Sequence, residues 1–364
     1  MIIGSIKEDL SLEKRVALTP EAAKSIIGLG LKICIEKNYA EHIGIKDEDF
    51  NKSGVEIKNS SIEVLNTCNL LLKVNCPSDK EISNIKEKTI LVGMFNPSQN
   101  KNKINDLLKK QIKIFSLELL PRITRAQSMD VLSSQSNLAG YRAVIDSIFE
   151  FEKAIPMMMT AAGTVPAAKV LVIGAGVAGL QAIATAKRLG AIVAATDVRS
   201  ASKEQVESLG GKFLSVEGAE DMETSGGYAK EATEEYKKKQ AEMMEEALKK
   251  NDIVICTALI PGKTAPRIIT EKLVKLMKSG SIIYDLAAEQ GGNSAYSEPG
   301  KINIIDGVKV IGVKSLMNRL PLTASNLYAK NLFSFIRNLY SREKKEFNIN
   351  LEDEIINKSL IKKV

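Results

Sequence analysis

The sequence predicts an α/β protein built from two domains, each with a parallel sheet flanked by helices. Three observations support this fold class. Short apolar segments alternate with helical patterns along most of the 364 residues, which is typical of parallel sheets. A glycine-rich turn joins an apolar strand to a helix in the middle of the chain. The length, with 44% hydrophobic residues, suits two domains of ordinary size.

Five apolar segments in the first third of the chain are predicted strands. They cover residues 1–6, 31–36, 70–74, 89–94 and 112–116. Helical patterns separate them, and Thr19-Pro20-Glu21 predicts the start of one helix. A capping hydroxyl, a proline at the first helical position and an acid near the positive helix end follow one another there.

The glycine-rich turn follows the apolar residues 170–173. It reads Gly174-Ala175-Gly176-Val177-Ala178-Gly179. Gly174 permits a tight turn, Gly176 has no Cβ to block a pyrophosphate, and Gly179 lets the helix pack close to the strand. The free N–H groups and the positive end of that helix would face the phosphates. These six residues therefore predict dinucleotide binding.

An acid ends the next predicted strand, about 20 residues further on, as this kind of site requires. Asp197 follows Ala194-Ala195-Thr196, where its carboxylate can accept hydrogen bonds from the adenosine ribose hydroxyls. A 2′-phosphate would meet a like charge there, so Asp197 predicts NAD in preference to NADP. The G-x-G-x-x-G pattern alone is weak evidence, but the strand, helix and acid around it agree.

The apolar run 170–186 also allows a second interpretation, a membrane span. Three glycines and Gln181 interrupt it, and the charged residues Lys169, Lys187 and Arg188 flank it. The run is also shorter than the ~20 residues needed to cross a bilayer. A buried strand followed by a packed helix explains it better.

The rest of the chain completes the predicted organisation. Further strands are expected at 212–216, 253–257, 281–286 and 308–313. Residues 133–151 are predicted as a helix connecting the domains, and 324–342 as a helix that packs back on the first domain. We therefore expect two Rossmann-like domains with a cleft between them. The first, 1–132 with 320–364, is discontinuous, and the second is 133–319.

A polar segment at 217–230 carries glycines and shows no periodicity, which predicts a long exposed loop. Such loops are functional lids in some proteins and plain connectors in others, and the residues leave both open. The following residues 231–250 alternate acids and lysines at helical spacing, which is typical of a solvated helix.

The bulk composition excludes several classes of function. The net charge of +7 is modest and aromatic residues are only 5%, which gives little support to nucleic-acid binding. The first residues do not form a signal peptide, and no segment is expected to span a membrane. The cysteines lack C-x-x-C pairing, which predicts buried, reduced thiols in a cytoplasmic protein without a metal site. They are Cys34, Cys68, Cys76 and Cys256.

Four further segments resemble one family. They are RVALTP at 15–20, PRITRAQSMDVLSSQSNLAGYRA at 121–143, TALIPG at 257–262 and DLAAEQGGN at 285–293. With the glycine-rich turn, they make the chain similar to the NAD(H)-binding alpha subunits of proton-translocating NAD(P) transhydrogenases. The resemblance implies a homodimer that binds NADH in the cytoplasm and passes hydride to NADP⁺ held by a beta subunit. A separate membrane-spanning subunit would couple this transfer to proton movement and hold the chain at the membrane.

The resemblance also implies roles for a polar loop before residue 134. Arg122 and Ser133 would contact the nicotinamide half of the nucleotide, and Gln127 and Asp130 would face the NADP-binding partner. Hydride transfer between two nicotinamides requires proximity, ring orientation and exclusion of water rather than a nucleophile or a metal. An ordinary surface ion pair between Arg122 and Asp130 is the alternative interpretation.

Further nucleotide contacts are implied by the same resemblance. They are Val198, Arg199, Tyr228, Ala258 and Leu259. Tyr228 corresponds to the tyrosine of a mobile loop in that family, which favours a lid over a connector at 217–230.

Alanine dehydrogenase is the main alternative, because it shares the expected two-domain plan. Arg15 and Lys73 resemble its substrate-binding positions, although Lys73 also fits an ordinary lysine at a strand end. Deamination requires a group that titrates near neutral pH, normally a histidine, and that family has one after the strand at 90–95. This chain has Asn96 there, which disfavours alanine turnover.

The single histidine of the chain does not replace the missing one. His42 lies in a polar stretch that is typical of a surface loop. A third hypothesis is a non-catalytic NAD-binding subunit, which the presence of Gln127 and Asp130 disfavours.

Overall fold

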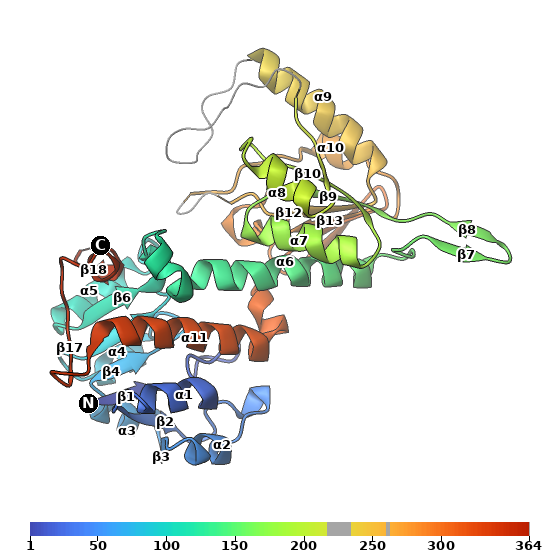
Figure 1. The fold of residues 1–364 in the computed structure, drawn as a ribbon. Helices are drawn as coiled ribbons and strands as arrows, with labels where there is room; N and C mark the ends of the chain where they lie inside the picture. The colour runs from blue at the N-terminus through green and yellow to red at the C-terminus, as the bar shows by residue number, and fades with distance from the viewer. Residues whose placement is uncertain (217–233, 260–262, 364) are drawn as a thin grey trace. The chain divides into compact units, whose positions relative to one another are not determined.

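The computed structural model describes residues 1–216, 234–259 and 263–363. These residues form two compact units (Figure 1). The first unit joins Met1–Gln135 to the chain from Met317 onward, and the second comprises Ser136–Leu316. Both ends of the chain therefore contribute to the first unit.

The first unit contains a seven-stranded sheet with the order β18-β6-β5-β4-β1-β2-β3. The strands are β1 (Ile2–Ser5), β2 (Lys32–Glu36), β3 (Glu56–Lys58), β4 (Leu70–Leu72), β5 (Ile90–Gly93), β6 (Lys113–Ser116) and β18 (Leu360–Ile361). All pairs are parallel except β18 with β6. The five predicted strands are present. The sequence does not predict β3 and β18, because such short segments carry no measurable alternation.

Helices cover both faces of this sheet. On one face lie α1 (Pro20–Ile27), α2 (Asp47–Lys52), α11 (Pro321–Leu339) and α12 (Glu354–Ser359). On the other lie α3 (Ser61–Thr67), α4 (Asp79–Asn84) and α5 (Lys101–Lys109). Neighbouring strand residues such as Leu71 and Leu72 point into different cores, as the alternation of a strand requires. The sheet is therefore buried on both sides, which its continuous apolar strands predict.

Two predicted helix boundaries can be compared with the structure. α1 begins at Pro20, as predicted, although the Thr19 side chain makes no capping hydrogen bond. The predicted helix 324–342 is α11, which begins earlier because Pro321 takes a first-turn position that suits proline.

The second unit contains another seven-stranded sheet, with the order β11-β10-β9-β12-β13-β15-β14. The strands are β9 (Lys169–Ile173), β10 (Ile192–Thr196), β11 (Lys212–Phe213), β12 (Ile253–Cys256), β13 (Ile282–Asp285), β14 (Ile302–Ile305) and β15 (Val308–Gly312). All pairs are parallel except β14 with β15. The strand order reverses direction between β9 and β12. In open sheets of this type, ligands bind outside the carboxyl ends of the strands at such a point.

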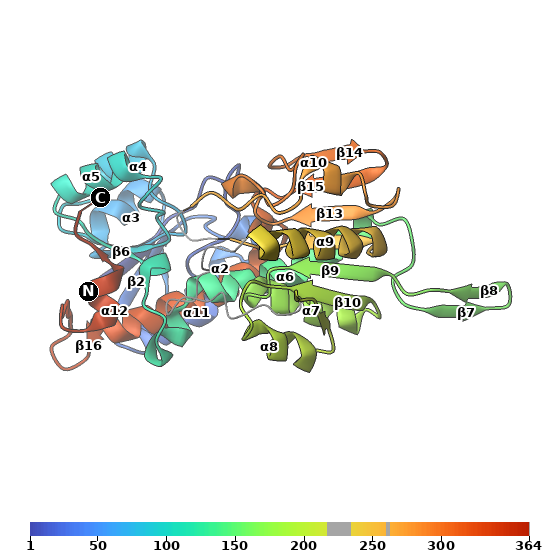
Figure 2. The ribbon, with the colours of Figure 1, turned by 90° about the horizontal axis from the view of Figure 1, so that it is seen from above.

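Helices also cover both faces of the second sheet (Figure 2). They are α6 (Val131–Glu150), α7 (Val177–Arg188), α8 (Ser202–Ser208), α9 (Glu234–Lys250) and α10 (Glu271–Val274). α9 and α10 pack against one face through residues such as Leu248 and Val274, and α6 packs against the other through residues such as Val144. α6 begins in the first unit and continues into the second.

Two hairpins of the second unit are additions to the predicted fold. β7 (Met158–Thr160) and β8 (Gly163–Val165) pair only with each other and project from the unit (Figure 1). β14 and β15 are joined by Asp306-Gly307, both with positive φ. An Asp-Gly pair between apolar segments is a strong hairpin signal, so the sequence did contain the information needed to predict β14.

Candidate nucleotide-binding site

The glycine-rich turn connects β9 to α7, as predicted. Gly174 has φ +94°, and a Cβ there would lie 2.7 Å from Thr257 Oγ1. A Cβ on Gly179 would lie 1.8 Å from the Gly174 carbonyl oxygen. A Cβ on Gly176 would meet nothing within 4 Å. The protein itself therefore requires glycine at 174 and 179, whereas at 176 the backbone faces open space that a ligand can approach.

The first turn of α7 presents its backbone N–H groups at this turn. Gly176 is the N-cap residue and supplies no capping side chain. α6 fixes the position of this turn, because a Cβ on Gly140 would lie 2.0 Å from the Ala178 carbonyl oxygen. Donors held in this way, at the positive end of a 12-residue helix, suit the phosphates of a dinucleotide.

Asp197 lies beside the glycine-rich turn. Its Oδ2 accepts a hydrogen bond from Ala175 N at 2.6 Å and another from Arg199 Nη2 at 3.0 Å. Its Oδ1 accepts from Arg199 N and Arg199 Nε, each at 2.9 Å. Burial acts to raise the pKa of Asp197, but the hydrogen bonds from Arg199 and Ala175 outweigh it and hold the pKa below the ordinary 3.8. The acid is therefore ionised and joined directly to the predicted phosphate loop.

The end of β12 provides the third side of the site. Thr257 Oγ1 donates a hydrogen bond to the Gly174 carbonyl at 2.8 Å. The side chain of Asn293 holds the next residue on both sides: its Oδ1 accepts from Ala258 N at 3.0 Å and its Nδ2 donates to Ala258 O at 2.8 Å. The structure thus brings Ala258 close to the glycine-rich turn, and it identifies Asn293 as a supporting residue that the sequence does not single out.

The remaining predicted nucleotide contacts differ in position. Val198 and Leu259 are exposed apolar side chains on the loops that follow β10 and β12. Tyr228 and the predicted loop 217–230 lie outside the described residues.

The polar loop with Arg122, Gln127, Asp130 and Ser133 belongs to the first unit. Residues Thr124–Met129 form a 3₁₀ helix, in which Ala126 and Met129 are anchored in the core while Gln127 is exposed. No ion pair joins Arg122 to Asp130 in the part of the chain that the structure describes, so the surface-pair interpretation is wrong.

Asp130 caps helix α6. Its Oδ1 accepts a hydrogen bond from Ser133 N at 2.9 Å, and its Oδ2 accepts one from Ser133 Oγ at 2.6 Å. An aspartate at this position stabilises the first turn of a helix. Two of the four predicted residues therefore have a local structural partner in each other.

Arg15 and Lys73 form buried ion pairs in the first unit. Lys73, only 2% exposed, lies 3.2 Å from a carboxylate oxygen of Glu8 and 2.9 Å from one of Glu81. Arg15 pairs with Glu13 at 2.7 Å. Burial raises the pKa of Glu8, although the Lys73 ammonium acts in the opposite direction. The interpretation of Lys73 as an ordinary strand-end lysine is therefore wrong, and both cations already have carboxylate partners within the chain.

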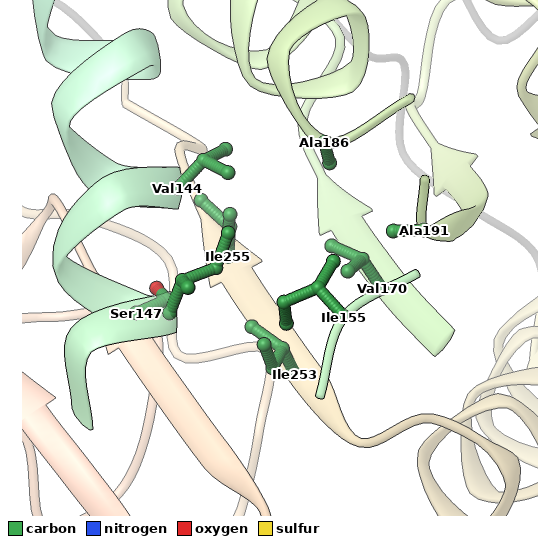
Figure 3. Close-up of a pocket in the computed structure, with 9 residues that line it drawn as sticks. Val144, Ser147, Ile155, Val170, Ala186, Ala191, Ile253 and Ile255 are labelled. Carbon is green, nitrogen blue, oxygen red and sulfur yellow. The ribbon is translucent and has the colours of Figure 1, made fainter. Parts of the chain in front are cut away.

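Three other features offer no ligand chemistry. A small cavity between α6 and the second sheet is lined by apolar side chains such as Val144 and Ile255 (Figure 3), and its one hydroxyl, Ser147 Oγ, donates to Ala143 O. His42 is exposed, as predicted, and its Nε2 lies 2.8 Å from the Lys14 carbonyl oxygen. All four cysteines are free thiols, of which Cys76 is half-buried and the other three are buried.

Comparison with known proteins places the chain in a family. The family model "Alanine dehydrogenase/PNT, N-terminal domain" matches residues 4–139, and the corresponding C-terminal domain model matches residues 143–363. The first portion of a divided NAD(P) transhydrogenase subunit alpha from Rhodospirillum rubrum is 50% identical over 363 residues, covering 98% of this chain and 94% of the relative. Its counterpart from Rickettsia prowazekii is 46% identical, covering 100% and 95%.

Solved structures agree with this placement. The crystal structure of a transhydrogenase from Sinorhizobium meliloti superposes with a TM-score of 0.90 at 44% identity, covering 100% of this chain and 99% of the other. An L-alanine dehydrogenase superposes with a TM-score of 0.82 at 22% identity, over 99% and 94% of the two chains, so it shares the fold. The chain therefore belongs to the alanine dehydrogenase/PNT family and, within it, to the NAD(P) transhydrogenase alpha subunits.

Proposed function

We propose that this chain is the NAD(H)-binding subunit of a proton-translocating NAD(P) transhydrogenase. The observation that carries the proposal is the arrangement at the carboxyl ends of β9, β10 and β12. A turn open at Gly176, N–H groups at the start of α7 and an ionised Asp197 meet there. These are the donors and the acceptor that the phosphates and the ribose of NADH require.

We assign nucleotide binding to residues 133–319. Gly174–Gly179 and Ala258 would hold the pyrophosphate and its surroundings, while Asp197, Val198 and Arg199 would hold the adenosine ribose. Tyr228 and Leu259 complete the proposed contacts. NADH supplies the hydride, so the chain has to bind, orient and exclude water, and needs no nucleophile of its own.

Residues 1–132 with 320–364 form the other proposed domain, which carries the polar loop. Arg122 and Ser133 would orient the nicotinamide half, and Gln127 and Asp130 would face a beta subunit that binds NADP(H). The Asp130–Ser133 hydrogen bonds support the part of this assignment that needs a fixed loop, because they anchor its end on α6.

The proposed assembly contains a homodimer, a beta subunit and a membrane-spanning subunit at the cytoplasmic face of the membrane. No helix among the described residues is long and apolar enough to cross a bilayer. The relatives are named as an alpha subunit or as one portion of a divided alpha subunit, and these names support assembly with further subunits.

An apolar surface of the second unit supports the homodimer. Phe149 at the end of α6 is 85% exposed, Met159 on the projecting hairpin 83% and Ile304 on the edge strand β14 66%. Ile304 pairs with Lys309, whose Nζ reaches the Glu150 carbonyl at 2.9 Å, so β14 and the end of α6 are neighbours. Side chains of this size expose on the order of 100 Å² each, and exposed apolar clusters of this extent mark interfaces.

The experiment that tests the function is hydride transfer in the reconstituted complex. The purified chain is mixed with the beta and membrane-spanning subunits, and NADH-dependent reduction of NADP⁺ is followed. We expect transfer only when all subunits are present, and no reduction of NAD⁺ with alanine. Alanine-dependent reduction by the chain alone would replace this proposal with the dehydrogenase. NADH binding without transfer in the complete complex would replace it with a non-catalytic subunit.

A further inference from the structure

We propose that Arg199 is a second selector of the nucleotide, a latent 2′-phosphate site that Asp197 keeps switched off. The inference rests on the proposed function, because it concerns the same ribose position. It adds a residue whose charge favours NADP(H), and it explains how one chain carries both an NAD-selecting acid and a phosphate-binding base.

The starting observation is that the Asp197 carboxylate is saturated. Its two oxygens together offer about four acceptor sites, and four donors already point at them. They are Ala175 N, Arg199 N, Arg199 Nε and Arg199 Nη2. A ribose hydroxyl can therefore bind Asp197 only if one of these donors leaves.

The guanidinium of Arg199 is the donor that can leave. Ala175 N and Arg199 N belong to the backbone of the turn and of the loop after β10, so they are fixed. The Asp197 side chain is 7% exposed, whereas that of Arg199 is 35% exposed and reaches the acid through a flexible chain. An ion pair exposed to this degree contributes little to stability, so a ribose hydroxyl can displace it at small cost.

The displaced guanidinium stays beside the ribose. The 2′-hydroxyl takes the place on the carboxylate that the guanidinium held, so the arginine is left next to the 2′ oxygen. A guanidinium presents a planar fork of donors that matches a phosphate. The 2′-phosphate of NADPH would thus meet an attractive arginine and a repulsive aspartate at the same position.

Asp197 decides the outcome because it is the buried and fixed charge of the two. A carboxylate in a low-dielectric position repels a phosphate more strongly than a half-exposed cation attracts it. Removing the carboxylate leaves the guanidinium as the charged group nearest the 2′ position. Asp197→Ala should therefore create NADPH affinity that depends on Arg199, rather than merely relax the discrimination.

The test measures dissociation constants for NADH and NADPH in the full chain and four variants. They are Asp197→Ala, Asp197→Asn, Asp197→Ala with Arg199→Ala, and Asp197→Ala with Arg188→Ala. Asp197→Asn keeps an acceptor for Ala175 N and serves if the alanine variant does not fold. Arg188→Ala is the matched control, because it removes an equal charge at the exposed C-terminal end of α7, about 17 Å along the helix from the glycine-rich turn.

We expect Asp197→Ala to bind NADPH at least about tenfold more tightly than the parent chain, as one charged hydrogen-bonded contact allows. The double variant with Arg199→Ala should lose this gain, and the one with Arg188→Ala should keep it. Adenosine 2′,5′-bisphosphate should compete in the same order, which locates the effect at the 2′-phosphate.

Two results overturn the inference: no gain of NADPH affinity in either Asp197 variant, or an equal gain in both double variants. Failure of the proposed function has a separate signature. In that case the parent chain does not bind NADH at all, before any substitution is made.

Discussion

At the scale of single residues, the three glycines of the turn have different physical roles. Gly179 is required by contact with the protein's own backbone, and Gly176 faces open space. The sequence predicts both positions from one pattern, but only the coordinates separate the glycine needed for folding from the one proposed to face the ligand.

This difference predicts opposite effects for two alanine substitutions. Gly179→Ala should lower the free energy of unfolding by about 1–3 kcal/mol or more, because its Cβ overlaps the Gly174 carbonyl. Gly176→Ala should leave the unfolding free energy within roughly 1 kcal/mol while weakening NADH binding. Urea denaturation and NADH titration of the two proteins check this. Equal loss of stability in both would show that Gly176 is a structural glycine.

Asp197 gives a prediction for pH. Hydrogen bonds from Arg199 hold its pKa below 3.8 against the effect of burial, so the acid stays ionised at all pH values above that range. Its contribution to the stability of the fold is complete above the pKa of the unfolded chain and is lost only as the pH falls through the folded pKa. NADH affinity should therefore be constant between about pH 8 and pH 5. A titration midpoint near pH 6 in the binding constant would assign the ribose contact to another group.

At the scale of elements, the start of α6 connects the polar loop to its helix. Asp130 caps the helix through Ser133, and asparagine caps a helix about as well as aspartate. Asp130→Asn should thus keep the fold and the NADH affinity but reduce hydride transfer in the complete complex, because the charge proposed to face the beta subunit is gone. Asp130→Ala, which also removes the cap, serves as the comparison and should cost about 1 kcal/mol of stability. A loss of NADH affinity in Asp130→Asn would contradict the partner-facing role.

The same elements show what a sequence can and cannot predict. The strand, turn and helix at 170–188 follow from local pattern, because each apolar run and each glycine acts on its neighbours in the chain. The Lys73 ion pairs join residues from three separate segments, and Asn293 supports Ala258 from a distant loop. No local pattern encodes such contacts, so these supporting residues appear only in the folded chain.

At the scale of the whole molecule, the proposed homodimer predicts an effect of charge on the exposed apolar surface of the second unit. Phe149→Glu should convert the dimer to monomers, because an ionised side chain would have to be desolvated in the interface. Ile62→Glu is a matched control, since Ile62 is also exposed but lies on α3 of the first unit. Sedimentation velocity of the three proteins measures the outcome. A dimer that persists in Phe149→Glu would exclude this surface as the interface.

The central claim is that this chain binds NADH selectively and leaves NADPH to a partner. The most direct measurement is a parallel titration of the purified, unmodified chain with NADH and NADPH at the same ionic strength. The account predicts saturable NADH binding, with NADPH binding at least about tenfold weaker, because a 2′-phosphate meets the buried Asp197. Equal affinity for the two nucleotides, or preference for NADPH, would contradict it.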